Sequence, residues 1–369
     1  MSLDPVRGGG TAERTFQLSR FLTKTGIDCS ILTTDLGLTE ERLEALGRTR
    51  VVALPCWSER FYFPGLDLKR IQRLVEENDL IHIMGHWTVI NALAYRAAVR
   101  ATKPYVVCPA GALPIYGRSR LLKRFYNRAV GRQIIGWANG HIAITPTEIA
   151  QFELYGIPPE KIVVIPNGID GEQCGYRDDA EFRRRYDLGA NPFFLFVGRL
   201  NPIKGPDLLL KAFGELKEQL PDYHLVMAGP DEGMLASLLE TAAALRIQHR
   251  VHFPGYLGQK EKSQAYHASA ALVIPSRQEA MSLVVLEAGL AGTPVLITDQ
   301  CGFDDVAAVS GGWIAQASVE SLRSGLLAMA GHPENLEIKG QNLKRYVQEN
   351  FLWDRMALRH LELFSALLP

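Results

Sequence analysis

One stretch of the sequence decides the fold. It reads Phe194-Leu-Phe-Val-Gly-Arg-Leu-Asn-Pro-Ile-Lys-Gly-Pro-Asp-Leu-Leu-Leu210. The apolar run at its start predicts a buried strand, and the apolar run at its end predicts a helix. Between them, Gly198, Arg199, Lys204 and Gly205 place two cations at the carboxyl end of the strand, beside a helix N-terminus. Such a loop favours binding of a diphosphate, and two surface cations in an ordinary strand-to-helix loop are the alternative.

Short runs rich in Val and Ile alternate with helical patterns along the rest of the chain. This alternation is typical of repeated βαβ units and of parallel sheets covered on both faces. Strands are predicted at residues 27–33, 51–55, 80–84, 105–108, 140–144, 162–165, 193–197, 224–228, 251–253, 271–274, 294–298 and 312–314. Helices are predicted at residues 12–25, 88–101, 121–135, 147–155, 281–291 and 341–368.

The strands fall into two series, which predicts an α/β protein with two Rossmann-like, doubly wound domains. The first domain is expected at residues 1–166 and the second at 192–350. Residues 167–191, rich in Gly, Asp and Arg, are the expected linker, and residues 351–369 the expected C-terminal helix, crossing back to the first domain. Parallel sheets of this kind bind ligands at the carboxyl ends of their strands, so we expect the site in a cleft between the domains.

The composition narrows the classes of function. Of 369 residues, 47% are hydrophobic and 22% charged, as in globular proteins. Lys and Arg number 40, as do Asp and Glu, so the net charge of zero disfavours a nucleic-acid partner. The five cysteines are scattered without a C-x-x-C pair, which indicates neither a disulfide framework nor a zinc site. With no signal-peptide pattern at the start, we expect a cytoplasmic location.

Two glutamates follow the strand predicted at 271–274. Glu279 lies in the loop, and Glu287 lies eight positions later in an apolar helix. Buried carboxylates need partners, and hydroxyl-rich ligands such as ribose and hexose supply hydrogen-bond donors. The free amides at the start of this helix would stabilise a phosphate, and they belong to Met281, Ser282 and Leu283. Alternatively, Glu279 caps the helix and Glu287 forms a structural salt bridge.

Taken together, these residues resemble the group 1 family of retaining, nucleotide-sugar-dependent glycosyltransferases. The hallmark of that family is an E-x7-E motif in the second domain of a GT-B fold, and Glu279 and Glu287 match its spacing. The resemblance covers nearly the whole chain. The other matching segments, in the family's order, are Gly8-Gly9-Gly10, Val164-Ile-Pro-Asn-Gly-Ile-Asp170, residues 198–205 and Gly292-Thr-Pro-Val295.

The resemblance implies a catalytic set in the second domain. Arg199 and Lys204, beside Gly198, would hold the donor diphosphate and neutralise the departing nucleotide. Glu279 and the amides that follow it would face the transferred sugar.

The resemblance also implies the remaining contacts of the donor and acceptor. Glu287 would bind the ribose hydroxyls, and Tyr256 or Leu257 would bind the base. The glycine loop at Gly9 and Gly10 would approach phosphate or acceptor, where a Cβ would obstruct the ligand.

The resemblance implies transfer of a hexose from a UDP or GDP sugar to a glycan or lipid-linked acceptor, as in bacterial surface-polysaccharide synthesis. Retention at the anomeric carbon is expected, with no metal and no cofactor besides the donor substrate, because Arg and Lys replace the divalent ion. A nucleotide-sugar-binding pseudoenzyme or assembly partner, and a sugar-nucleotide epimerase of the GT-B fold, are the alternatives. A nicotinamide-dependent enzyme is disfavoured because no strand precedes a full G-x-G-x-x-G fingerprint.

The sequence departs from the family pattern at two places. Only residues 1–7 precede the glycine loop, and Pro5 would break a strand there, so we expect the first strand to be shortened, missing or supplied from outside this sequence. Residues 108–114 lack the His or Arg that many relatives carry after the fourth strand. His86, at the end of the strand predicted at 80–84, is the compensating catalytic candidate, and a structural histidine is the alternative.

A basic amphipathic helix is predicted within residues 118–132. Its six cations are Arg118, Arg120, Lys123, Arg124, Arg128 and Arg132. The residues expected on its apolar face are Leu121, Leu122, Phe125, Ala129 and Val130. Such a helix favours peripheral contact with an anionic membrane at the inner face or with a phosphorylated lipid acceptor, and a helix packed on its own sheet is the alternative.

Overall fold

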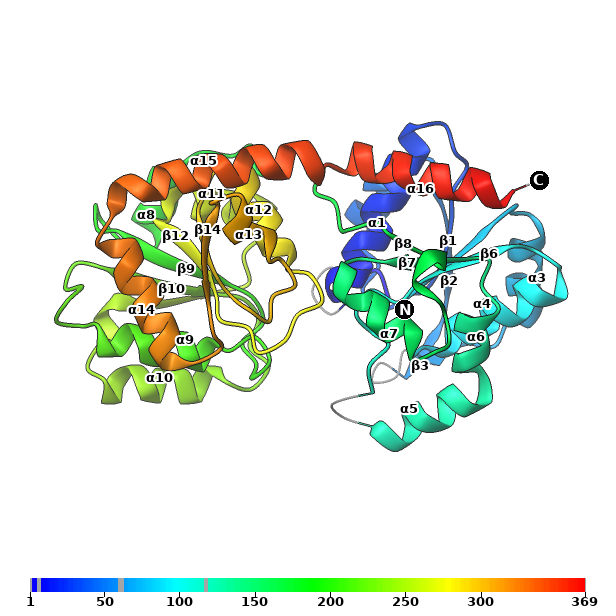
Figure 1. Ribbon diagram of the computed structural model, residues 1–369, viewed down its shortest axis with the longest axis horizontal. Coiled ribbons are helices and arrows are strands. Elements are labelled where there is room, and N and C mark those ends of the chain that lie inside the picture. The colour runs from blue at the N-terminus through cyan, green and yellow to red at the C-terminus, as the bar shows by residue number, and fades with distance from the viewer. Residues whose placement is uncertain (1, 5–7, 59–62, 116–118, 369) are drawn as a thin grey trace. The chain divides into compact units, whose positions relative to one another are not determined.

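The computed structural model describes residues 2–4, 8–58, 63–115 and 119–368, so Pro5 and Arg118 lie outside the described residues. The chain divides into two compact units. Met1–Gly168 and Trp353–Pro369 form the first unit, and Ile169–Leu352 form the second. The segment expected as a linker therefore belongs to the second unit, and the C-terminal helix belongs to the first (Figure 1).

The strands of the first unit form two parallel sheets and one antiparallel hairpin. A pair in the order β1-β2 and a four-stranded sheet in the order β5-β6-β7-β8 are parallel, and β3 pairs with β4 antiparallel. The strands are β1 Ser30–Thr34, β2 Arg50–Leu54, β3 Cys56–Ser58, β4 Phe63–Pro64, β5 Ile81–Met84, β6 Tyr105–Cys108, β7 Gly140–Ala143 and β8 Ile162–Val164. As the sequence predicted, the described residues before Gly8 form no strand.

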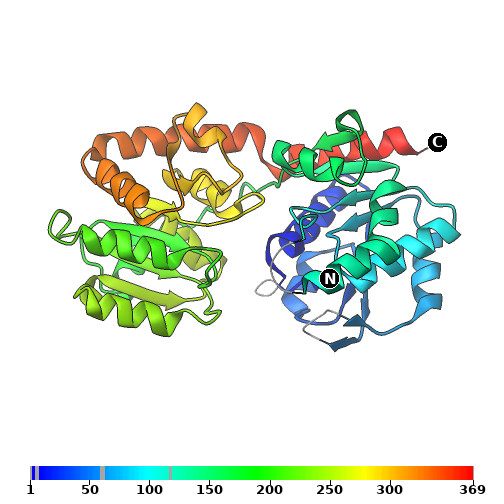
Figure 2. The same cartoon turned by 60° about the horizontal axis from the view of Figure 1, so that its bottom comes forward.

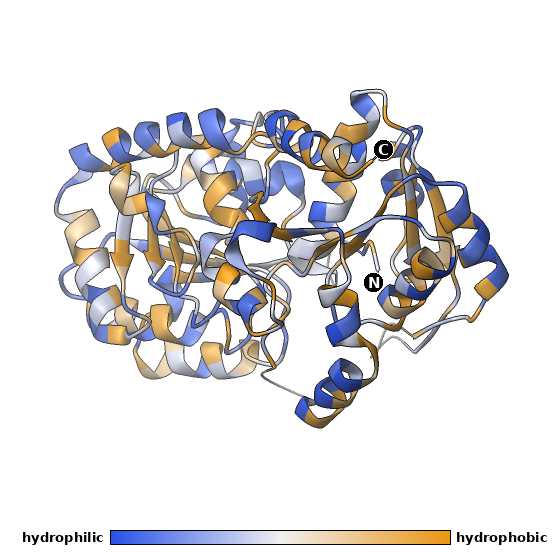
Figure 3. Ribbon diagram, turned by 45° about the vertical axis from the view of Figure 1, so that its right-hand side comes forward, coloured by the Kyte–Doolittle hydropathy of each residue, from blue (hydrophilic) through white to orange (hydrophobic). Residues whose placement is uncertain are grey.

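Helices with a buried apolar face cover these sheets, whereas the helices Glu40–Ala45 and Arg120–Tyr126 have no buried residue. The helices are α1 Gly9–Lys24, α2 Glu40–Ala45, α3 Leu68–Glu76, α4 Val89–Arg100, α5 Arg120–Tyr126, α6 Arg132–Gly136, α7 Ile149–Glu153 and α16 Trp353–Leu367. Two single 3-10 turns are η2 Pro146–Glu148 and η3 Pro159–Lys161. Thr88 illustrates why these helices begin where they do, since its side chain accepts a hydrogen bond from Asn91 N at the start of α4. In Figure 3 the strands are mostly orange, and the helices alternate blue and orange.

The second unit is built on one parallel sheet in the order β11-β10-β9-β12-β13-β14. Its strands are β9 Phe193–Val197, β10 His224–Ala228, β11 Val251–Gly255, β12 Ala271–Ile274, β13 Val295–Thr298 and β14 Gly312–Ala315. The strand order reverses between β9 and β12, which are hydrogen-bonded neighbours with Leu195 opposite Leu272. This is the doubly wound topology predicted from the sequence.

Helices pack on both faces of this sheet (Figure 2). They are α8 Asp179–Arg185, α9 Pro206–Glu215, α10 Leu235–Ala244, α11 Gln259–Ala268, α12 Leu283–Ala291, α13 Asp305–Ala308, α14 Val319–Ala330 and α15 Pro333–Asn350, with one 3-10 turn, η4 Gln248–Arg250. One core joins α9, α10 and α14 to the strands through residues such as Phe213, Leu238 and Leu326. Burial of these large apolar side chains is the main source of the unit's stability.

Three sequence predictions of helices are corrected. Residues 167–191 contain α8, since Asp178 caps its start and Phe182 is buried. The long helix predicted at 341–368 is two helices, α15 and α16, and residues 351 and 352 separate them. The helix predicted at 121–135 is interrupted by a π-helical turn, η1 Asn127–Gly131, because the buried Asn127 side chain hydrogen-bonds to His86 and Tyr155 instead of facing solvent.

A buried arginine fixes the end of the first unit. Arg14 of α1 is 1% exposed, and its guanidinium donates to the carbonyls of Ile165 and Pro166 and to Asn167 Oδ1 at 2.8–3.0 Å. The same guanidinium lies over the ring of Trp353, the first residue of α16. The segment that leaves the unit at Gly168 and the helix that re-enters it are therefore both held by one side chain of α1.

Replacement of Arg14 by Met should lower the free energy of unfolding of the first unit by about 3 kcal/mol, because three acceptors lose a charged donor in a buried place. Arg20→Met on the same helix is the matched control, since Arg20 is partly exposed and donates to Gln17. Urea denaturation of both variants measures the difference. Equal stabilities for the two variants would contradict the assigned role of Arg14.

Candidate functional site

The loops that follow β9 and β12 meet at the point where the strand order of the second sheet reverses. Arg277 joins them, since its guanidinium makes two bonds of 2.7 and 2.9 Å to the Asp207 carboxylate and its amide donates to Ile203 O. Ligands of doubly wound sheets bind at this kind of position. The structure therefore brings together the two segments that the sequence had singled out separately.

An ion pair occupies the centre of this junction. Lys204 Nζ lies 2.7 Å from Glu279 Oε1, and the Glu279 side chain is only 7% exposed. Ser276 donates its hydroxyl to the same carboxylate oxygen at 2.6 Å. The amide of Glu279 donates to Gln300 O, which fixes the loop to the end of β13. Lys204 and Glu279, predicted as a phosphate ligand and a sugar ligand, are thus direct neighbours.

A second ion pair holds the other predicted cation. Arg199 NH1 donates to Glu232 Oε1 at 2.8 Å, and Asn201 Nδ2 donates to Glu232 Oε2 at 2.6 Å. Asn201 is buried, and its Oδ1 accepts a hydrogen bond from Lys204 N. Burial raises the pKa of Glu232, but the bonds from Asn201 and Arg199 outweigh it and keep the pKa below its ordinary value. Glu232 is therefore ionised at neutral pH.

Two glycines allow the loops to approach this closely. Gly205 has φ +68°, and a Cβ there would lie 2.1 Å from Pro275 O. Gly229, after β10, has φ +145°, and a Cβ there would lie 1.9 Å from Gly198 O. A side chain at either position would both strain the backbone and clash with a carbonyl of the neighbouring loop. The Gly198 amide donates to Ala228 O at the end of β10, and the predicted contact of Gly198 with the donor stays a prediction.

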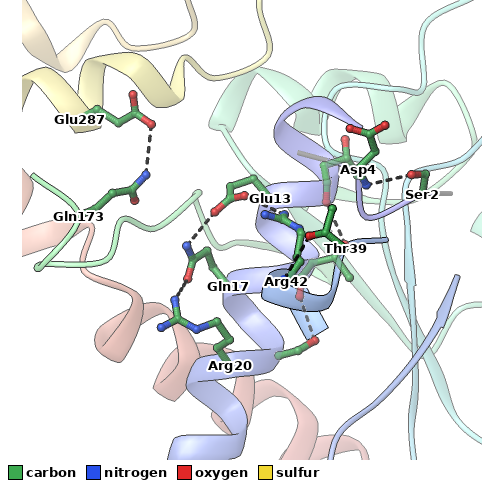
Figure 4. Close-up of polar contacts among 12 residues, drawn as sticks. Ser2, Asp4, Glu13, Gln17, Arg20, Thr39, Arg42, Gln173 and Glu287 are labelled. Atoms are coloured by element: carbon green, nitrogen blue, oxygen red, sulfur yellow. Dashed lines mark hydrogen bonds and ion pairs between the residues drawn. The ribbon is translucent and has the colours of Figure 1, made fainter. Parts of the chain in front are cut away.

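Glu287, the second glutamate of the motif, is nearly buried in α12 and fully bonded. Its carboxylate accepts hydrogen bonds of 2.6 Å from Lys262 Nζ and from the Tyr266 hydroxyl. Gln173 Nε2 lies 3.3 Å from it, and Figure 4 shows these two side chains pointing toward each other. The structural salt bridge, given as the alternative for Glu287, is therefore present. Ribose hydroxyls would share or replace these bonds.

The amino end of α12 has one unsatisfied polar group. The helix begins at Leu283, two residues later than predicted, and Ser282 is its N-cap residue. Ser282 Oγ is buried and has no hydrogen-bond partner among the described residues. Met281 is also buried beside it. A hydroxyl and amides at a helix N-terminus suit a phosphate or sugar oxygen, and donor binding at this end of α12 stays a prediction.

The residues predicted for the base and for the glycine loop lie in two different environments. Tyr256 follows β11 and is 52% exposed, whereas Leu257 is buried. Gly9 and Gly10 are exposed in the first turn of α1, and Gly9 has φ +61° with open space where a Cβ would be. Tyr256, Gly9 and Gly10 are therefore accessible to solvent, whereas the Leu257 side chain is buried among the core residues.

His86 is placed differently from the prediction. It follows β5, but its ring is 1% exposed and packs edge-on against Trp87, Tyr126 and Tyr155. Its Nε2 is hydrogen-bonded to Asn127 Oδ1 at 3.0 Å, while Nδ1 is buried without a partner among the described residues. The ring supports the π-helical turn, which fits the structural alternative given for it, and a catalytic role for His86 stays a prediction.

Helix α5 carries its apolar side chains into solvent. Leu121 is 79% exposed and Phe125 is 70% exposed, and Leu122 is exposed beside them. Arg120, Arg124 and Arg128 are exposed on the same segment, and Lys123 lies over the ring of Trp87. The packed alternative for this segment holds for Val130, beyond α5, which is buried, and for Tyr126, which packs against the same core cluster. The part of the chain that the structure describes has no helix long and apolar enough to cross a membrane.

Several partners of the site residues were not found from the sequence. Glu232 lies just after β10 in Gly229-Pro-Asp-Glu232. An acidic residue after the carboxyl end of a strand is the sequence feature that could have marked it as a site residue. Asn201 lies inside the very stretch that decided the fold, as a polar residue that is buried. Lys262 and Tyr266 are four residues apart on one face of α11, but nothing in the sequence connects that face with Glu287.

Two family models match the chain, one on each half. Residues 8–173 match the model described as Glycosyltransferase Family 4. Residues 178–345 match the model described as Glycosyl transferases group 1. The two matches divide close to the boundary between the two units.

Curated relatives and solved structures agree with these matches. The D-inositol 3-phosphate glycosyltransferase of Nocardia farcinica is 32% identical over 255 residues, which are 66% of this chain and 56% of the relative. That of Frankia alni is 36% identical over 180 residues, 46% of this chain and 44% of the relative. The chain thus spans about half the length of the curated relatives it matches.

Among solved structures, HepE of Anabaena in complex with UDP and glucose is similar, with a TM-score of 0.80 and 18% identity, covering 98% of this chain and 97% of that one. WaaG, a glycosyltransferase involved in lipopolysaccharide biosynthesis, is similar with a TM-score of 0.69 and 20% identity, covering 95% of each chain. The predicted α/β fold of the GT-B class is confirmed.

The histidine at the π-helical turn predicts a pH dependence of stability. Burial lowers the pKa of His86 to about 4, although the bond to Asn127 opposes the shift. An unfolded histidine titrates near pH 6.5, so below that pH the unfolded chain binds a proton that the folded chain does not. The free energy of unfolding should therefore fall by about 2 kcal/mol more between pH 7 and pH 5 in the wild type than in His86→Gln.

Urea titrations of both proteins at the two pH values measure this difference. The variant keeps a pH dependence of its own, because burial also lowers the pKa of His82, to about 3. Parallel losses in the two proteins would show that His86 is not buried in its neutral form.

Proposed function

The chain belongs to the group 1 glycosyltransferase family, and from this premise we propose that it transfers a hexose from a nucleoside-diphosphate sugar to a hydroxyl of a glycan or glycolipid acceptor. The observation that carries the proposal is the junction at the strand-order reversal, where Arg199, Lys204 and Glu279 gather. UDP is the first nucleotide to test, because the similar HepE structure holds UDP and glucose.

The chemistry of this junction suits a diphosphate leaving group. Arg199 and Lys204 would bind the phosphate oxygens with charge-assisted hydrogen bonds, while Ser282 and the first amides of α12 would bind the phosphate or the sugar. Fixed positive charge next to the departing group stabilises the negative charge that develops there. The two cations therefore supply what a divalent ion supplies elsewhere, and we propose that transfer needs no metal.

We propose that the transfer retains the configuration at the anomeric carbon. The bond between this carbon and the diphosphate oxygen breaks, and its electron pair leaves with the nucleoside diphosphate. The acceptor oxygen then forms the new bond on the same face, and its proton passes to the departing phosphate oxygen. Glu279, beside Lys204, would lie near the sugar in this arrangement and stabilise its transient positive charge.

We propose a lipid-linked acceptor or a glycan at the inner face of a bacterial membrane, with α5 as the membrane contact. An exposed helix that carries both apolar side chains and cations suits an anionic lipid surface. Leu121, Leu122 and Phe125 would enter the interface, and Arg120, Arg124 and Arg128 would meet the lipid headgroups. WaaG, which is involved in lipopolysaccharide biosynthesis, gives this class of acceptor a parallel in a similar structure.

The donor site is tested by titration calorimetry with UDP, GDP, ADP and their sugar conjugates. Lys204→Ala should weaken binding of the preferred nucleotide by about 1.5–3 kcal/mol, because a charge-assisted phosphate contact is lost. Lys211→Ala, an exposed lysine of α9 in the same unit, is the matched control and should bind like the wild type. Binding and turnover should persist in EDTA. Unchanged affinity in Lys204→Ala would exclude this cation from the site.

The membrane contact is tested by flotation with vesicles of neutral or anionic lipid. Neutralising Lys123, Arg124 and Arg128 together should weaken binding to anionic vesicles by about 1 kcal/mol per cation, more at low salt than at high salt. The triple variant of Lys69, Arg70 and Arg73, exposed cations of α3 in the same unit, is the control. If the wild type floats equally with neutral lipid, or if both triple variants lose binding equally, α5 is not the membrane contact.

A further inference from the structure

Both cations of the predicted phosphate site form an ion pair with a carboxylate in this structure. Lys204 is paired with Glu279, and Arg199 is paired with Glu232. The four formal charges cancel, whereas the sequence alone had predicted two cations facing the ligand. The proposed transfer places Glu279 beside the sugar, but it gives Glu232 no role.

The backbone holds Glu232 at this position. The loop after β10 is joined to the loop after β9 by hydrogen bonds from Leu200 N to Pro230 O and from Glu232 N to Leu200 O. An isolated parallel bridge between Leu200 and Asp231 lies in the same place. The backbones of Gly229 and Gly198 lie so close together that a Cβ at Gly229 would clash with Gly198 O. These contacts fix the backbone of Glu232 beside the loop that carries Arg199.

The two oxygens of Glu232 have different partners. Oε1 accepts from Arg199, an exposed cation, and Oε2 accepts from Asn201, a buried amide. The Glu232 side chain is 41% exposed and that of Arg199 is 44% exposed, so water can solvate either group after separation. Exchange of the Arg199 bond for a phosphate oxygen therefore costs little, while the Asn201 bond keeps the carboxylate in place.

We infer that Glu232 is an internal counter-ion that Arg199 exchanges for the diphosphate of the donor, so that Glu232 weakens nucleotide binding and eases release of the nucleoside diphosphate product. The inference rests on the proposed function of this site. With the donor bound, the fixed carboxylate remains close to the phosphates and repels them. Glu232 thus sets the affinity of the site, and it is a positioning residue without contact to the reacting atoms.

Glu232→Gln tests this inference, because the amide oxygen can still accept from Asn201 while the negative charge is removed. The dissociation constants of UDP and of pyrophosphate should fall about threefold or more in low salt, and less in high salt. With a sugar donor, KM should fall while kcat stays equal or falls. Glu215→Gln is the matched control, since Glu215 belongs to the same unit, is similarly exposed and is paired with Arg323.

A double variant separates this exchange from a general effect of charge. If Glu232 acts through Arg199, Glu232→Gln should tighten UDP binding less in an Arg199→Ala background than in the wild type. UDP affinity that is unchanged or weaker in Glu232→Gln, while the wild type binds UDP, overturns the inference alone. Weaker UDP binding with unchanged pyrophosphate binding would make Glu232 a ligand of the nucleoside and also overturn it. A wild type that binds no nucleoside diphosphate overturns both the proposed function and this inference.

Discussion

The partly buried ion pair of Lys204 with Glu279 is the interaction on which the site of this protein depends. It joins the loops of two neighbouring strands at the place where the strand order reverses, and Ser276 completes the bonding of the carboxylate. A carboxylate as buried as Glu279 needs a paired cation, so the pair fixes the positions of both side chains. A hydrogen-bond network also connects the loop after β10 to these two loops. It runs from Arg199 through Glu232 and Asn201 to the Lys204 backbone. A bound ligand would then replace the carboxylate partners of Lys204 and Arg199 while the loops keep their positions.

In the first unit, the buried polar side chains of Arg14 and His86 hold segments of the chain together. Arg14 binds the carbonyls at the end of the unit, and His86 supports a π-helical turn through Asn127. Both are buried groups that hold chain segments together, and neither is presented to solvent. The exposed features of this unit are the glycines at the start of α1 and the amphipathic surface of α5.

The sequence predicted the strands of the second unit closely, because short runs of Val, Ile, Leu and Phe bounded by Gly and Pro have few other stable arrangements. It also placed Arg199, Lys204, Glu279 and Glu287 on the correct elements. It offered a salt bridge for Glu287 as an alternative but could not identify Lys262 as the partner of Glu287 or Glu232 as the partner of Arg199, because these residues are distant in sequence and meet only after the sheet forms. The sequence left His86 open between a catalytic and a structural role for a related reason, since its enclosure by Tyr126 and Tyr155 depends on a π-helical turn without a sequence signature.

Hydrogen exchange of the backbone amides with and without UDP tests most directly whether the junction of the second unit is the nucleotide site. The account predicts slower exchange with UDP in the loops at residues 198–205, 229–233 and 275–283, because a bound diphosphate would tie together segments that already share hydrogen bonds. Helix α5 should exchange at the same rate in both states. Protection confined to the first unit, or unchanged exchange in all three loops at saturating UDP, would contradict the account.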